Sequence, residues 1–227
     1  MVGRRWLEMT WRDGLFLHWP VDPSVVAETL PDGLAVATHD GDAYLGVVPF
    51  VMESIRPRGS PIGRSFPELN LRTYVTGPAG PGVYFYSLDA ADAVGVGIAR
   101  RLFSLPYYRA QMRVDRDGDA VTITSDRTHG DAGRATFDAT YEPTGDSFTP
   151  VSGSLPAFLL ENYRFYTAGR RLYRGEIAHE PWTLRPATAT VRTNSLFEAN
   201  GFDVPSGEPV AHYAEPIEVT ADRLRAV

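Results

Sequence analysis

The residue types best suited to chemistry gather in residues 67–89, whose first arm reads Pro-Glu-Leu-Asn-Leu-Arg-Thr-Tyr-Val. Strict alternation predicts a β-strand here, because successive side chains of a strand point to opposite faces. One face carries an acid, an amide, a guanidinium and a phenol: Glu68, Asn70, Arg72 and Tyr74. The opposite face carries Leu69, Leu71, Thr73 and Val75. The polar face could grip a carboxylate through Arg72 and move a proton through Glu68.

A turn rich in glycine and proline, residues 77–82, leads into a second arm that ends at Asp89. Its two faces carry Tyr84, Tyr86 and Leu88 on one side and Phe85, Ser87 and Asp89 on the other. Pairing the apolar faces of the two arms predicts that Arg72 lies near Asp89 and Glu68. The same row could instead be a salt-bridged surface facing water, since antiparallel sheets commonly have one wet face.

Glu68 and Asp89 are therefore the candidate catalytic acids or bases, and Arg72, Asn70 and Ser87 are candidate ligand contacts. Aromatic residues extend the candidate site, because a small-molecule cavity is commonly lined by rings with a few polar anchors. These residues are Tyr74, Tyr86, Tyr107 and His179, the last within His-Glu-Pro-Trp. Packing in the core is the alternative explanation for each tyrosine.

The five histidines are scattered and form no His-x-His or His-Glu-x-x-His pair, so no metal site is predicted. No Gly-x-Ser-x-Gly motif supports a serine hydrolase. Gly95-Val-Gly97 lacks a third glycine at Arg100 and a βαβ context, so a dinucleotide site is not expected. We therefore expect no cofactor.

Composition narrows the classes of protein further. The 227 residues contain no cysteine, and all 22 basic residues are arginine, so thiol catalysis and a lysine Schiff base are both excluded. A net charge of −6 argues against a nucleic-acid or anionic-membrane surface. No apolar run is long enough for a membrane span and no signal peptide is recognised, which favours the cytoplasm. The oligomeric state stays open, a homo-oligomer included.

The elements that must position these residues are mostly short strands. We expect a hairpin over residues 34–51, a helix from Ala90 to Phe103, and a meander of strands from Tyr108 to Glu142. A short helix follows at 155–163 and a tight hairpin at 164–173. With no linker-like stretch, residues 1–227 read as one domain. Together, these elements predict an α+β fold, namely an antiparallel β-barrel with a few short packed helices.

Several motifs resemble the YqjF-like domain-of-unknown-function family, which is placed in the acetoacetate decarboxylase-like superfamily. They are Glu68 to Val75, Gly82 to Asp89, Leu105-Pro-Tyr107, Phe158 to Tyr166 and His179 to Trp182. The resemblance runs from Trp11 to about Leu184 and weakens over the final forty residues. It implies a cone-like antiparallel barrel with an internal cavity, and hence that the polar row faces that cavity.

The resemblance does not supply an activity, because the chemistry of the family is not established. The lysine imine of acetoacetate decarboxylase is ruled out here, since the chain has no lysine. Relatives tend to carry Glu-Arg-Tyr where this chain has Glu161-Asn162-Tyr163, so either Arg164 takes over the role of that arginine or the role is lost. Three hypotheses follow: a protein that binds a small carboxylate, a lysine-independent lyase, isomerase or hydrolase, and a structural or interaction barrel without a ligand.

Overall fold

The computed structural model describes residues 6–92, 105–130, 132–169 and 171–227. Strands make up most of this part of the chain, and the helices in it are only four to six residues long. The strands are β1 (Leu7–Arg12), β2 (Gly14–Val21), β3 (Ala35–Val36), β4 (Ala43–Pro57), β5 (Arg64–Gly77), β6 (Gly80–Ala90), β7 (Tyr107–Asp117), β8 (Ala120–Arg127), β9 (Thr136–Pro143), β10 (Arg164–Ala168), β11 (Leu172–Ala178), β12 (Leu184–Asn194), β13 (Val210–Ala214), β14 (Ile217–Ala221) and β15 (Arg225–Ala226). The helices are α1 (Pro23–Ala27), α3 (Leu155–Leu160) and α4 (Leu196–Ala199).

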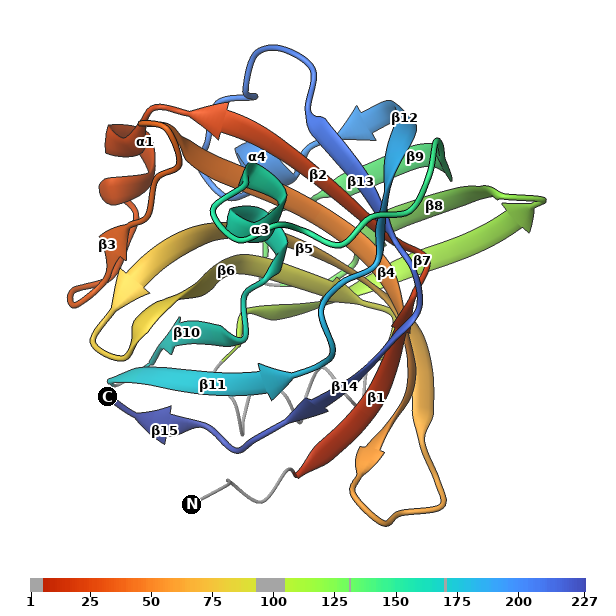
Figure 1. Ribbon diagram of the computed structural model, residues 1–227, viewed down its shortest axis with the longest axis horizontal. Helices are drawn as coiled ribbons and strands as arrows, with labels where there is room; N and C mark the ends of the chain where they lie inside the picture. The colour runs from red at the N-terminus through yellow and green to blue at the C-terminus, as the bar shows by residue number, and fades with distance from the viewer. Residues whose placement is uncertain (1–5, 93–104, 131, 170) are drawn as a thin grey trace.

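The strand pairings form two closed circuits that share β4, β5 and β6. The first circuit runs β1–β4–β5–β6–β10–β11–β14 and returns to β1. The second runs β2–β4–β5–β6–β7–β8–β9–β12–β13 and returns to β2. Figure 1 shows the shared strands crossing the middle of the molecule, with β10, β11 and β14 on one side and β8, β9 and β12 on the other.

Each circuit has its own buried cluster, and β5 contributes to both. Leu69 and Leu71 pack into the cluster of the second circuit, with side chains from β2, β8, β9 and α4. Tyr74, on the alternate face of β5, packs into the cluster of the first circuit, with side chains from β1, β4, β6 and α3. The alternation predicted along β5 is confirmed, and the alternative of a surface facing water is wrong, because Glu68 and Asn70 are only 3% and 2% exposed.

Local features of the sequence explain several elements. Asp22 caps α1 by accepting a hydrogen bond from the backbone N–H of Ser24, with Pro23 in the first turn. The meander is confirmed as β7, β8 and β9, which pair in antiparallel succession. The tight hairpin is confirmed as β10 and β11, and the short helix at 155–163 is present as α3 but ends at Leu160.

Other expectations were wrong. The hairpin over residues 34–51 does not form, because β3 pairs with β5 while β4 pairs with β1, β2 and β5. The sheet is mixed rather than purely antiparallel, since β6 lies parallel to both β7 and β10. Strands β1 and β14, which close the first circuit, were not predicted. The expected helix loses its first residue, because Ala90 belongs to β6; its remainder, including Gly95, Gly97 and Arg100, lies outside the described residues apart from Ala91 and Asp92.

In the part of the chain that the structure describes, none of the helices has the length and apolar character needed to cross a bilayer.

Candidate functional site

A cavity of about 190 Å³ lies within the first circuit of strands. Most of the residues around it are aliphatic or aromatic, and the polar ones come mainly from β5, from the segments flanking β10 and β11, and from the start of β7. The polar and charged lining residues are Glu68, Asn70, Arg72, Tyr107, Asn162, Arg164, His179, Glu215 and Asp222. An apolar cavity with a few polar anchors is the usual form of a small-molecule site.

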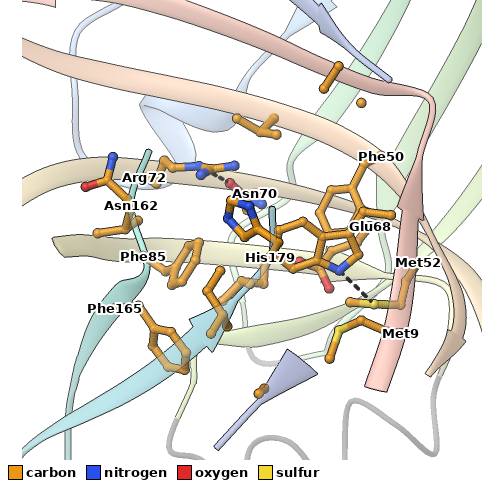
Figure 2. A pocket seen from close by; sticks show the side chains of 18 of the residues that line it. Met9, Phe50, Met52, Glu68, Asn70, Arg72, Phe85, Asn162, Phe165 and His179 are labelled. Carbon is orange, nitrogen blue, oxygen red and sulfur yellow. Dashed lines mark hydrogen bonds between the residues drawn. The ribbon is translucent and has the colours of Figure 1, made fainter. Parts of the chain in front are cut away.

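The polar row of β5 lies along one wall of this cavity. Glu68, Asn70 and Arg72 occupy alternate positions of a regular strand, so all three point to the same side. Two residues of strand rise separate each from the next, which places the Cα atoms of Glu68 and Arg72 roughly 13 Å apart. Figure 2 shows Arg72 beside Asn70, with Glu68 farther along the wall toward Phe50 and Met52.

Arg72 is held as a cation at one end of the row. Its Nε donates a hydrogen bond to Asn70 Oδ1 at 2.9 Å. Its guanidinium carbon lies 5.3 Å from the ring centre of Phe16 and 5.9 Å from that of Phe85, within range of cation–π attraction. Burial lowers the pKa of Arg72, but a guanidinium starts so high that it stays charged. Among the described residues, its two terminal nitrogens have neither a hydrogen-bond nor an ion-pair partner.

Glu68 forms the other end of the row and is paired with Tyr107. The phenol of Tyr107 donates a hydrogen bond to Glu68 Oε2 at 2.8 Å. Burial raises the pKa of Glu68 to about 7, although the Tyr107 hydroxyl and the Arg72 charge both act in the opposite direction. Burial also raises the pKa of Tyr107 well above its ordinary value, so the phenol keeps its proton. A carboxyl that titrates near neutrality can both give and accept a proton.

His179 reaches the cavity from the end of β11. Its Nδ1 lies 2.7 Å from the backbone oxygen of Glu180, and a carbonyl can only accept, so Nδ1 carries the proton. The ring stacks on Tyr163 with the centres 4.6 Å apart and lies 4.9 Å from the ring of Trp182. Burial lowers the pKa of His179 and keeps it neutral near pH 7. Its Nε2 is buried and has no partner within the described residues.

Tyr74 is close to the cavity but does not line it. Its hydroxyl shares a hydrogen bond of 2.6 Å with Nε2 of His18, and its ring packs against Phe158. Burial lowers the pKa of His18 well below its ordinary range, and the charge of Arg72 adds to that effect. Tyr74 therefore supports the wall next to Arg72 through His18.

The prediction that Asp89 and Ser87 share a face with Arg72 is wrong. A β-bulge lies at Tyr86, where Leu71 pairs with Ser87 but Arg72 pairs with Phe85. The extra residue reverses the alternation, so Phe85 faces the cavity while Ser87 and Asp89 face the second circuit. The alternating pattern of the second arm gave no sign of this irregularity.

On that far side these residues have partners of their own. Asp89 accepts a hydrogen bond of 2.7 Å from Arg127 Nε in an ion pair whose side chains are 1% and 2% exposed. Ser87 Oγ accepts from Asn200, and the hydroxyl of Tyr86 lies 2.7 Å from that of Thr29. The structure thus brings Glu68, Asn70, Arg72, Tyr107 and His179 together at the cavity and separates Asp89, Ser87 and Tyr86 from them.

Sequence reasoning missed most of the apolar wall. Trp11, Phe16, Phe50 and Met52 come from β1, β2 and β4, and of these strands β1 and β2 are far from β5 in the chain. Only the non-local pairing of β1 with β4 places Trp11 beside Met52, and no local pattern could have indicated it. Within the described residues, no group of three or more histidine or acidic side chains is arranged to hold a metal ion.

Comparisons with known proteins show which proteins this chain is similar to. It is 41% identical over 223 residues to the uncharacterized protein YqjF of Bacillus subtilis (strain 168), covering 96% of this chain and 91% of that protein. The structure is similar to that of the enduracididine biosynthesis enzyme MppR complexed with pyruvate, with a TM-score of 0.70 at 14% identity over 100% of this chain and 91% of that one. It is also similar to the acetoacetate decarboxylase of Legionella pneumophila, with a TM-score of 0.65 at 12% identity over 98% and 86% of the two chains.

At such low identity the two structural matches establish the fold, which is that of acetoacetate decarboxylase, and nothing about activity. The family is established by sequence. Residues 8–218 match the family model described as an uncharacterized conserved protein, DUF2071. The chain therefore belongs to the DUF2071, or YqjF-like, family.

Proposed function

We propose that this protein binds a small organic carboxylate in the cavity of the first strand circuit, which acts as a closed barrel around the ligand. Arg72 carries the proposal. It is a partly buried cation facing a mostly apolar cavity, and its two terminal nitrogens have no partner among the described residues. A guanidinium offers two parallel donors that match the two oxygens of a carboxylate. Asn70 fixes the plane of that fork by accepting from Nε.

The cost of leaving this cation unpaired supports the same conclusion. A charge that is removed from water without a partner destabilises the protein. A bound anion removes that destabilisation and forms charge-assisted hydrogen bonds. The structural match to MppR complexed with pyruvate, a carboxylate, agrees with this choice of ligand class.

The experiment is a binding titration of small carboxylates against the wild type and Arg72→Gln, which removes the charge but keeps most of the side-chain length. We expect the variant to bind at least about tenfold more weakly, because each hydrogen bond to a charged group contributes about 1.5–3 kcal/mol. Arg192→Gln, on the exposed face of β12, is the matched control and should bind as the wild type does. Equal binding by Arg72→Gln, with its fold intact by circular dichroism, would refute the proposal.

A second candidate function, a lysine-independent lyase, isomerase or hydrolase, is favoured by the pKa of Glu68, which burial raises to about 7. In that case Glu68 moves the proton while Arg72 and the Tyr107 phenol stabilise the negative charge that develops on the substrate. Turnover that disappears in Glu68→Gln, with carboxylate binding retained, supports this function. Absence of turnover over a broad panel of acids leaves the binding function. Absence of any binding leaves a structural or interaction role.

A further inference from the structure

We infer that the ligand is a monocarboxylate with a bulky apolar tail, rather than a short acid, a dicarboxylate or a phosphate ester. This inference rests on the proposed function and specifies its ligand. Three features of the cavity carry it: the order of its lining residues, the hydrogen bonds of its tryptophans and the distribution of its charges.

The register of β4 against β5 shows that the cavity changes character along its length. Arg72 pairs with Gly46 at the polar end, whereas Glu68 pairs with Phe50. The next residue of β4 on the same face is Met52, which pairs with Trp11 of β1. The cavity therefore has a donor-rich end at Arg72, and beyond Glu68 it has an apolar end where β1 meets β4. A ligand whose carboxylate lies on Arg72 has to extend the rest of its length along this gradient.

The two tryptophans of the wall use their polar atoms within the protein. Trp11 Nε1 donates to the sulfur of Met52 at 3.2 Å, and Trp182 Nε1 donates to the backbone oxygen of Leu160 at 2.9 Å. Both indoles therefore lack a free donor for the ligand and offer it only carbon surface. Phe50 packs against Trp11 with the ring centres 5.2 Å apart, which extends that surface. Contact with aromatic carbon favours an apolar tail, because burying apolar surface is the main favourable term available there.

The charges around the cavity oppose a second anionic group. The other cation in the described lining, Arg164, already donates Nη1 to the backbone oxygen of Pro81 at 3.0 Å and lies 4.0 Å from Glu176. Three acids, Glu68, Glu215 and Asp222, line the cavity. A dicarboxylate or a phosphate ester would place its additional charge beside these acids without a free counter-charge. A single carboxylate therefore fits the site best.

The test is a calorimetric or NMR titration of the wild-type chain at pH 7 with propionate, butyrate, hexanoate, phenylacetate and succinate. We expect affinity to rise about fourfold for each added methylene until the cavity is full, because each buried CH₂ contributes about 0.8 kcal/mol. Phenylacetate should bind more tightly than propionate, and succinate should bind at least about tenfold more weakly than butyrate. A flat series, or succinate as the tightest ligand, overturns the inference.

A substitution at the apolar end of the cavity tests whether the tail of the ligand lies there. Leu7 lines the cavity from β1 and is only partly buried, so Leu7→Trp should fold while narrowing that end. We expect Leu7→Trp to weaken hexanoate at least about tenfold and to leave propionate unchanged, whereas Leu7→Met, of similar volume, should match the wild type for both. Equal loss for both acids, or no loss for either, contradicts the inference. If propionate binds as tightly as hexanoate, the inference fails and the proposed function stands; if none of the acids binds, the proposed function fails with it.

Discussion

Gly46 of β4 lies directly across the ladder from Arg72 of β5, and a Cβ atom on Gly46 would come within 3.2 Å of Arg72 Cγ. The same Cβ would come within 2.9 Å of the His18 ring, on the other side of Gly46 in β2. Contacts this close force a neighbour to move, and His18 is fixed by its hydrogen bond to Tyr74. The missing side chain of Gly46 therefore sets the position from which Arg72 reaches into the cavity.

Gly46→Ala is accordingly expected to displace Arg72 and to weaken carboxylate binding at least about tenfold, with a loss of about 1–3 kcal/mol in the free energy of unfolding from overpacking. Titration calorimetry and urea unfolding measure the two effects. The control is Gly130→Ala, because nothing lies within 4 Å of a Cβ at Gly130. Unchanged carboxylate affinity in Gly46→Ala would show that Arg72 does not depend on this contact.

The pKa of Glu68 predicts how stability depends on pH. Burial raises it from 4.5 to about 7, so between these values the folded chain holds a proton that the unfolded chain has released. Stability from this group is therefore greatest at low pH and falls as pH rises from about 4.5 to 7, by about 3 kcal/mol in all. Glu68→Gln, which cannot ionise, should lack that decline. Urea unfolding of both proteins from pH 4.5 to 8 tests this, and parallel curves would contradict the raised pKa.

The buried pair of Asp89 and Arg127 is expected to be structural. Asp89→Asn leaves the guanidinium of Arg127 buried without a counter-charge, which costs about 3–5 kcal/mol. Asp138→Asn breaks an ion pair with Arg192 at the surface and should shift the unfolding midpoint much less. Carboxylate affinity should be unchanged in both, because neither acid lines the cavity. A loss of affinity in Asp89→Asn, in protein that remains folded, would return Asp89 to the binding site.

Tyr74→Phe separates support of the wall from contact with the ligand. The change removes the hydroxyl that shares the 2.6 Å hydrogen bond with His18 and leaves a buried imidazole nitrogen unsatisfied. We expect the free energy of unfolding to fall by about 1–3 kcal/mol, with carboxylate affinity changing less than about twofold. Thermal unfolding with and without ligand measures both quantities. A large loss of affinity at unchanged stability would instead indicate that Tyr74 touches the ligand.

The sequence was informative wherever a pattern stayed regular over a single strand. Alternation put Glu68, Asn70 and Arg72 on one face, and β5 has no irregularity between them. The same reasoning failed on β6, because one extra residue at Tyr86 reverses every face beyond it. Asp89 was therefore assigned to Arg72, while its true partner, Arg127, lies on β8. A bulge depends on pairing with a neighbouring strand, which the alternation of one strand does not encode.

The long-range pairings were the other limit. The parallel contacts of β6 with β7 and β10, and the contacts of β1 with β4 and β14, join segments widely separated in the chain. These pairings place an interior on each side of β5. The alternating pattern of β5 was equally consistent with a sheet that has one buried face and one face in contact with water. Resemblance to the family favoured the cavity, but the wall formed by Trp11 and Met52 needed the three-dimensional arrangement.

Because β5 is shared by both interiors, its cavity face and its core face are the two sides of a single backbone. A bulkier residue at Asn70 would push the backbone that also carries Leu69 and Leu71, so altering selectivity from β5 endangers folding. Strand β1 does not carry two buried faces in this way, since most of its residues are only partly buried. Laboratory evolution of new ligand preferences should accordingly accumulate its successful substitutions on β1, and β5 should remain nearly invariant.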